Sequence, residues 1–207
     1  MDCAKFLGVL IDSNLTWKPH ILQLAQKVAR HYAVLNRIRY KINAKVMLTL
    51  YDTMILPYIS YCAIVWAGSA TMYLRKLHII QKKVLRLVFL ANSRSHSKPI
   101  FKQLHRLTIF DIYIYITGIP SYMYLNLNSI TPQSFSQTFE TNSNIHSHFT
   151  RTANNLHVPM ARTNVRKSAL MICGPKIWNS TPLTVRKSNS EFIFKRRIKA
   201  WLLSRYI

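Results

Sequence analysis

The acidic residues are the side chains whose number and spacing say most about the chemistry open to this chain. Only 6 occur among 207 residues, and they stand far apart: Asp2, Asp12, Asp52, Asp111, Glu140 and Glu191. Enzymes that use a pair of Mg²⁺ ions need carboxylates close enough to hold both metals, and no Asp-Asp pair is present. The sequence therefore predicts no catalytic residue, no metal and no cofactor within this chain.

Histidine and cysteine leave one alternative open, a zinc site. The candidates are His146, His148 and His157, with Cys173 further along, but they lack the paired Cys-x-x-Cys or His-x-x-x-His spacing of zinc ligands. Loop histidines are the favoured interpretation. There is also no glycine-rich phosphate loop and no G-x-S-x-G motif, so catalysis is not expected.

The charge balance points to a polyanionic partner. Lys and Arg number 29 against 6 acids, which gives a net charge of +23. RNA and DNA are the expected partners, because a folded domain tolerates such a charge only with counterions or a polyanion nearby. A generally basic, solvated surface is the alternative. Three widely spaced cysteines and the lack of a secretory signal favour an intracellular protein of the nucleus or cytoplasm.

Apolar spacing predicts amphipathic helices with basic outer faces. In residues 19–39 an apolar stripe lies opposite Lys27, Arg30 and Arg37. The stripe consists of Ile21, Leu24, Val28, Tyr32 and Leu35. Residues 73–90 place a second stripe opposite Arg75, Lys82, Lys83 and Arg86. Its members are Leu74, Leu77, Gln81, Val84, Leu85 and Val88.

Capping and breaking residues place the other helices. Asn43 is a candidate N-cap for residues 44–56, which Pro57 should kink or end. Residues 107–127 are expected to form a core helix interrupted near Gly118 and Pro120. Ser188 and Glu191 resemble a capping box before a last helix. The buried stripe of that helix would be Phe194, Ile198, Trp201 and Leu202.

Three further segments complete the expected organisation. Residues 4–12 are predicted to form a buried strand, the remnant of a sheet whose other strands are missing. Residues 131–150 are rich in Ser, Thr, Asn and Gln, which indicates a linker. Residues 46–67 are long enough to span a bilayer, but Asp52 and Pro57 favour a buried core helix over a membrane protein. The predicted fold is mainly α, a helical bundle with a short strand and a smaller basic C-terminal segment.

Six ordered blocks cover much of the chain. They are KFLGVLIDSNLTWKPHI (5–21), LNRIRYKINAKVMLTLYDTMILPYISYCAIVWAG (35–68), LRKLHIIQKKVLRLVF (74–89), HSHFTR (146–151), RTNVRKSAL (162–170) and GPKIWNSTPLTVRKSNSEFIFKRRIKAWLLSRY (174–206). Together these blocks resemble the carboxy-terminal part of reverse transcriptases from jockey-like and other LINE-type non-LTR retrotransposons. The resemblance implies the end of the palm at residues 1–13, a thumb-like domain at 14–130, a linker at 131–150 and a basic segment at 151–207.

The resemblance also implies roles for particular residues. Phe6, Leu7, Gly8 and Val9 match the primer-grip strand, and the basic helix faces match thumb helices that hold the template-primer hybrid. To these faces we add Arg162, Arg166 and Lys176 in the basic segment as nucleic-acid-binding candidates. The catalytic palm, with its Mg²⁺, and an endonuclease would precede Met1, so we expect binding without synthesis. A free-standing basic RNA-binding or structural protein is the alternative.

Overall fold

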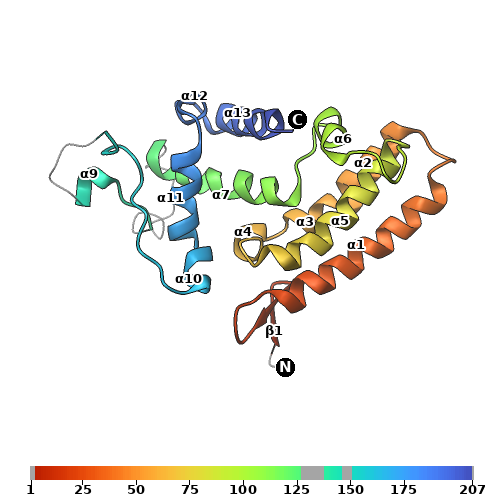
Figure 1. The fold of residues 1–207 in the computed structure, drawn as a ribbon, viewed down its shortest axis with the longest axis horizontal. Helices are drawn as coiled ribbons and strands as arrows, with labels where there is room; N and C mark the ends of the chain where they lie inside the picture. Colours follow the sequence, from red (N-terminus) through yellow and green to blue (C-terminus); the bar gives the residue numbers. More distant parts are fainter. Residues whose placement is uncertain (1–2, 127–137, 146–150, 207) are drawn as a thin grey trace. The chain divides into compact units, whose positions relative to one another are not determined.

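The computed structural model describes residues 3–126, 138–145 and 151–206, and helices dominate it, as the sequence predicted (Figure 1). It divides into two compact units. Unit 1 comprises residues 1–113 and 202–207, and unit 2 comprises residues 114–201. The assignment of segments to palm, thumb, linker and basic C-terminal segment remains a prediction, because compact units do not by themselves identify these parts.

Unit 1 begins with a hairpin rather than the predicted single buried strand. Strand β1 (Cys3–Phe6) pairs antiparallel with β2 (Val9–Asp12), and Phe6 faces Val9 across the turn. Leu7 and Gly8 form that turn with φ of 44° and 83°, the left-handed pair that a tight hairpin needs. The prediction of a lone buried strand is wrong because this turn reverses the chain, so β1 is the partner of β2, and β1 is exposed.

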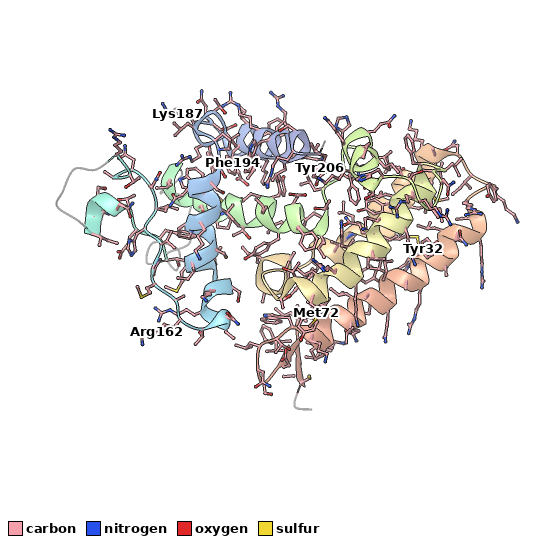
Figure 2. All side chains as sticks on the ribbon, in the orientation of Figure 1. Tyr32, Met72, Arg162, Lys187, Phe194 and Tyr206 are labelled. Atoms are coloured by element: carbon pink, nitrogen blue, oxygen red, sulfur yellow. The ribbon has the colours of Figure 1, made fainter. Side chains whose placement is uncertain are left out.

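Two long helices follow the predicted pattern. Helix α1 (Lys18–Ile38) packs along α5 (Thr71–Val88). Every member of the predicted α5 stripe is buried. In α1 the stripe is buried too, except Tyr32, which is half-buried (Figure 2). Helical periodicity therefore placed the core side of both helices correctly.

The apolar segment 46–67 folds as three short helices. They are α2 (Ala44–Met54), α3 (Leu56–Ser60) and α4 (Ala63–Trp66). Asn43 caps α2 as predicted, since its side chain accepts a hydrogen bond from the Val46 N–H at 2.8 Å. Helix α2 ends before Pro57, also as predicted. Across the part of the chain that the structure describes, no helix is long and apolar enough to cross a membrane.

A fully buried amide joins three elements of unit 1. Gln81 of α5 donates from Nε2 to the Tyr51 hydroxyl of α2 and to the Leu107 carbonyl, both at 3.0 Å. Its Oε1 accepts from the N–H of Ile109, the first residue of α7 (Ile109–Asn126), at 3.0 Å. The Gln81 side chain thus provides hydrogen-bond partners for the first N–H of α7 and for a loop carbonyl. Burial removes both groups from water, so neither could otherwise be satisfied.

The start of α7 is also capped by a side chain, that of Thr108. The Asp111 N–H donates to Thr108 Oγ1, and the Asp111 carboxylate accepts from the Thr108 and Tyr206 hydroxyls. The Thr108 N–H donates to the Tyr206 hydroxyl at 2.9 Å. Burial, and then the neighbouring carboxylate, raise the pKa of Tyr206 well above its usual range. Tyr206, near the end of the chain, thereby holds the first turn of α7. Helix α6 (Ser97–Gln103) lies between α5 and α7 in the sequence.

Unit 2 is built from the rest of α7 and the helices that follow it. These are α9 (Asn142–Ile145), α10 (Asn164–Ser168), α11 (Leu170–Ser180), α12 (Leu183–Arg186) and α13 (Glu191–Ser204). Tyr122 stacks on Phe194 with ring centroids 4.4 Å apart and donates to the Ser188 carbonyl at 2.8 Å. Trp178 of α11 lies 6.0 Å from the same Phe194 ring, so aromatic rings form this core.

Two predictions for unit 2 need correction. Helix α7 is continuous through Gly118 and Pro120. Gly118 serves packing, because a Cβ there would lie 2.9 Å from Ile198 Cδ1 of α13. The predicted capping box of Ser188 and Glu191 is wrong: a simple N-cap lies two residues later, where Ser190 Oγ accepts from the Ile193 N–H at 3.3 Å, whereas Ser188 is buried and donates to the Val185 carbonyl. The stripe itself is confirmed at Phe194, Ile198 and Leu202, with Trp201 half-buried.

Most of the predicted linker, together with His146 and His148, lies outside the described residues. In the described part of this linker, Thr141 forms an isolated antiparallel β-bridge with Leu156, and α9 begins at Asn142.

We predict that Gln81→Leu lowers the free energy of unfolding by about 3 kcal/mol. Leucine keeps the volume but leaves the Leu107 carbonyl and the Ile109 N–H buried without a partner. Urea unfolding followed by circular dichroism measures the change. Lys76→Leu, an exposed position on the same helix, should change it by less than about 0.5 kcal/mol. Equal effects of the two substitutions would contradict the role of the amide.

Candidate nucleic-acid interface

The outer face of α5 carries basic side chains and no acid. Arg75 and Lys83 are exposed, and Lys82 is half-buried. Arg86 is half-buried as well, and its Nε donates to the Ser95 carbonyl at 2.9 Å, which holds the loop after α5. Of the predicted quartet, Arg75 and Lys83 are therefore the most accessible, while Arg86 also has a structural contact.

The predicted cations of α1 differ in the same way. Arg30 and Arg37 are exposed. Lys27 is half-buried, with its Nζ 5.8 Å from the centre of the Tyr58 ring of α3, a cation-π contact. Arg30 and Arg37 are thus free to meet a polyanion from the solvent side of α1.

The acids near these helices already have partners. Both Asp52 oxygens accept from the Arg106 guanidinium in a bidentate ion pair. Asp12 accepts from the N–H groups of Thr16 and Trp17 at 2.9 and 2.8 Å. Burial raises the pKa of Asp12, but these hydrogen bonds together outweigh burial and lower it. The carboxylates therefore do little to neutralise the basic faces.

The tip of the hairpin presents the predicted primer-grip-like residues. Phe6 is 65% exposed and Leu7 is 73% exposed, whereas Val9 is buried. The Leu7 carbonyl accepts a hydrogen bond from the Tyr61 hydroxyl at 2.8 Å, and a Cβ on Gly8 would lie 3.8 Å from the Tyr61 ring. An apolar tip with a fixed backbone can thus contact a ligand.

A buried histidine attaches this hairpin to α1. His20 Nδ1 accepts from the Leu10 N–H at 3.3 Å, and its ring meets Trp66 edge-on at 5.6 Å. Burial, and then the positive charge of Lys27, lower the pKa of His20 to about 4. The neutral ring is the form that accepts this bond, since protonation would convert Nδ1 into a donor.

The remaining predicted cations lie in unit 2. Arg162 precedes α10 (Figure 2), Arg166 lies in α10 and Lys176 lies in α11, and all three are exposed. Thr163 caps α10 by accepting from the Arg166 N–H at 3.3 Å. The sequence analysis did not identify Tyr61 or His20, because each acts through a contact with a distant strand or turn that no local pattern announces.

Among the side chains that the structure describes, no group of three or more His, Cys, Asp or Glu residues gathers in space. His157 and Cys173 belong to that part of the chain, and the other two candidate zinc ligands do not.

A region of this chain is related to the RNA-directed DNA polymerases of LINE-type retrotransposons. One relative is the "Probable RNA-directed DNA polymerase from transposon X-element" of Drosophila melanogaster, 32% identical over 119 residues, which cover 53% of this chain and 12% of the relative. Another is the "RNA-directed DNA polymerase from mobile element jockey" of Drosophila funebris, 28% identical over 87 residues, which cover 41% of this chain and 10% of that relative.

The predicted resemblance is therefore confirmed for part of the chain. The matched part is about a tenth of the length of each relative. No family model matches the chain, and no solved structure does so.

We predict that acidification from pH 7 to pH 5 destabilises the protein partly through His20. The pKa of His20 is about 4 in the folded state and about 6.5 in the unfolded state, so the folded protein favours the neutral ring. The stabilisation that results is complete above pH 6.5 and is lost as the pH falls toward 4. The loss between pH 7 and 5 should be about 1 kcal/mol after solvent screening is allowed for. Urea unfolding at each pH measures it.

His20→Gln should flatten this pH dependence, whereas His96→Gln, at an exposed position, should leave it unchanged. His78, whose pKa is lowered by burial and then by Lys82, contributes equally to all three proteins. A His20→Gln slope identical to that of the parent protein would refute the assignment.

Proposed function

We propose that this chain is the thumb-like, nucleic-acid-binding part of a LINE-type reverse transcriptase and that it holds an RNA/DNA template-primer duplex. The observation that carries the proposal is the exposed, acid-free basic face of α5 in a chain of net charge +23. Its relatives are named RNA-directed DNA polymerases, which must hold both strands of such a duplex. The exposed hairpin tip would contact the primer, as the primer-grip resemblance implies.

The proposed mode of binding is recognition of phosphates by charge. Lys and Arg side chains on α1 and α5 contact phosphate oxygens, which position the duplex but carry no sequence information, and the exposed cations of unit 2 can bind phosphates in the same way by themselves. The helices therefore bind unrelated sequences with similar affinity. This binding of a template-primer duplex would take place in the nucleus or the cytoplasm.

We also propose that these 207 residues alone do not synthesise DNA. Asp12, Asp52 and Asp111 belong to separate elements, and each of these carboxylates accepts hydrogen bonds from protein donors. A pair of Mg²⁺ ions would need two carboxylates side by side. The Mg²⁺ expected for the polymerase family would then be held by residues outside this chain.

We predict a steep salt dependence for binding to an RNA/DNA hybrid. With about six phosphates engaged, log Kd plotted against log salt should have a slope of about 4 to 5, because each contact releases condensed counterions. Fluorescence anisotropy with a labelled hybrid between 50 and 200 mM KCl measures the slope. A flat response would mean that the basic faces are merely solvated.

We predict that Arg75→Glu combined with Lys83→Glu weakens binding of the hybrid at 100 mM salt by about tenfold or more. Both residues are exposed, so the free energy of unfolding should change by less than about 1 kcal/mol. The loss should be similar for unrelated sequences, since phosphate contacts are removed. This pair is preferable to Lys82 and Arg86, which are half-buried.

The matched control is Lys98→Glu with Lys102→Glu, which changes the charge by the same amount on exposed positions of α6. That control should weaken binding no more than about threefold, because it acts only through overall charge. Lys187→Glu, an exposed position after α12, tests unit 2. If Lys187→Glu abolishes binding while the α5 pair has no effect, the duplex lies on unit 2 and the assignment of α5 is wrong.

A further inference from the structure

The turn between α1 and α2 presents a tyrosine that the fold does not use for its core. Tyr40 is 80% exposed, among the most exposed large side chains of the described residues. Burial of such a large ring would stabilise the protein, and leaving the ring in water forgoes that stabilisation. An aromatic ring in this position gains stability only from a partner that covers it.

One face of the ring is already covered by an arginine. The Arg39 guanidinium carbon lies 4.4 Å from the centre of the Tyr40 ring, a close cation-π contact. Arg39 is held there by a hydrogen bond from its NH1 to Asn36 Oδ1 at 3.1 Å. The ring is therefore oriented before any ligand arrives, and its other face is the accessible one.

The charges around the ring are all positive. Arg37, Lys41 and Lys45 are exposed within five positions of Tyr40. No acid occurs between Asp12 and Asp52 in the sequence, and both of those carboxylates are engaged elsewhere. A ligand of this turn must therefore combine a flat ring with negative charge.

We propose that the turn formed by residues 37–45 is a binding site for unpaired nucleotides, with a base stacked on the open face of Tyr40. Arg37, Lys41 and Lys45 contact the flanking phosphates. The base must be unpaired, because bases in a duplex are covered by their neighbours, whereas a single strand offers its π-faces to aromatic side chains. This site rests on the proposed function and adds a single-strand contact to the duplex contacts of α5.

The test uses a 12-nucleotide single-stranded RNA that carries one 2-aminopurine, and the RNA/DNA hybrid of the same length. The fluorescence of 2-aminopurine falls when the base stacks, so it reports stacking rather than proximity of charge. At 100 mM salt Tyr40→Ala should weaken binding of the single strand by about tenfold and abolish the quenching. Binding of the hybrid should change by less than about twofold, and Tyr40→Phe should behave like the parent protein.

The matched control is Phe192→Ala, which removes an aromatic ring that is 74% exposed on α13. It should leave both affinities unchanged. Parent-like quenching by Tyr40→Ala, or an equal loss of single-strand and hybrid binding, would overturn the stacking site. If the parent protein binds the hybrid with the expected salt slope but does not quench the single strand, this inference alone fails. If it binds neither, the proposed function fails as well.

Discussion

The buried amide of Gln81 is the contact on which the arrangement of unit 1 depends. It is a polar group in the middle of an otherwise apolar helix face, and it is tolerated because donor and acceptor sites are both used. Its partners belong to α2, to the loop before α7 and to the first turn of α7. An apolar side chain could fill the space but could not fix where α7 starts, so Gln81 specifies position as well as stability.

The few acids of the chain serve the fold, and this explains why the basic faces stay unpaired. Asp12 orders the turn into α1, Asp111 accepts from the Thr108 and Tyr206 hydroxyls at the start of α7, and Asp52 holds Arg106 against α2. Each of these acids is placed where it satisfies backbone or buried groups. With 6 acids against 29 cations, little negative charge is left for the solvent side of α1 and α5. The excess positive charge is thus available to a partner.

Local periodicity was sufficient to predict the buried sides of the long helices α1 and α5, because the spacing of apolar residues fixes which side of a helix is buried. It succeeded for α1 and α5 and for the Asn43 cap. It failed where a tight turn decides the outcome, as at Leu7 and Gly8, where two positive φ angles turn a supposed strand into a hairpin. The prediction of Ser188 as the N-cap was wrong because two nearby serines could both cap the helix. Packing buries Ser188 and leaves Ser190 as the cap.

The candidate site was less predictable than the fold because its geometry depends on long-range contacts. Exposed cations can be counted from the sequence, and the helix pattern indicates their face. The bond between Tyr61 and the Leu7 carbonyl joins residues 54 positions apart, and no pattern in either segment indicates it. The stacking of Arg39 on Tyr40 joins neighbouring residues. The sequence does not indicate it, however, because it does not tell whether the Tyr40 ring is exposed or buried.

The hairpin shows how fold and proposed function are coupled. A two-stranded hairpin is at best marginally stable alone, so its position must come from its neighbours. Val9 is its buried apolar anchor, His20 holds the Leu10 N–H, and Tyr61 holds the tip. The tip itself keeps Phe6 and Leu7 in water. A ligand at the tip would therefore act on an element held by a few contacts with α1 and the α3–α4 turn, and those contacts would set how rigidly the proposed primer contact is presented.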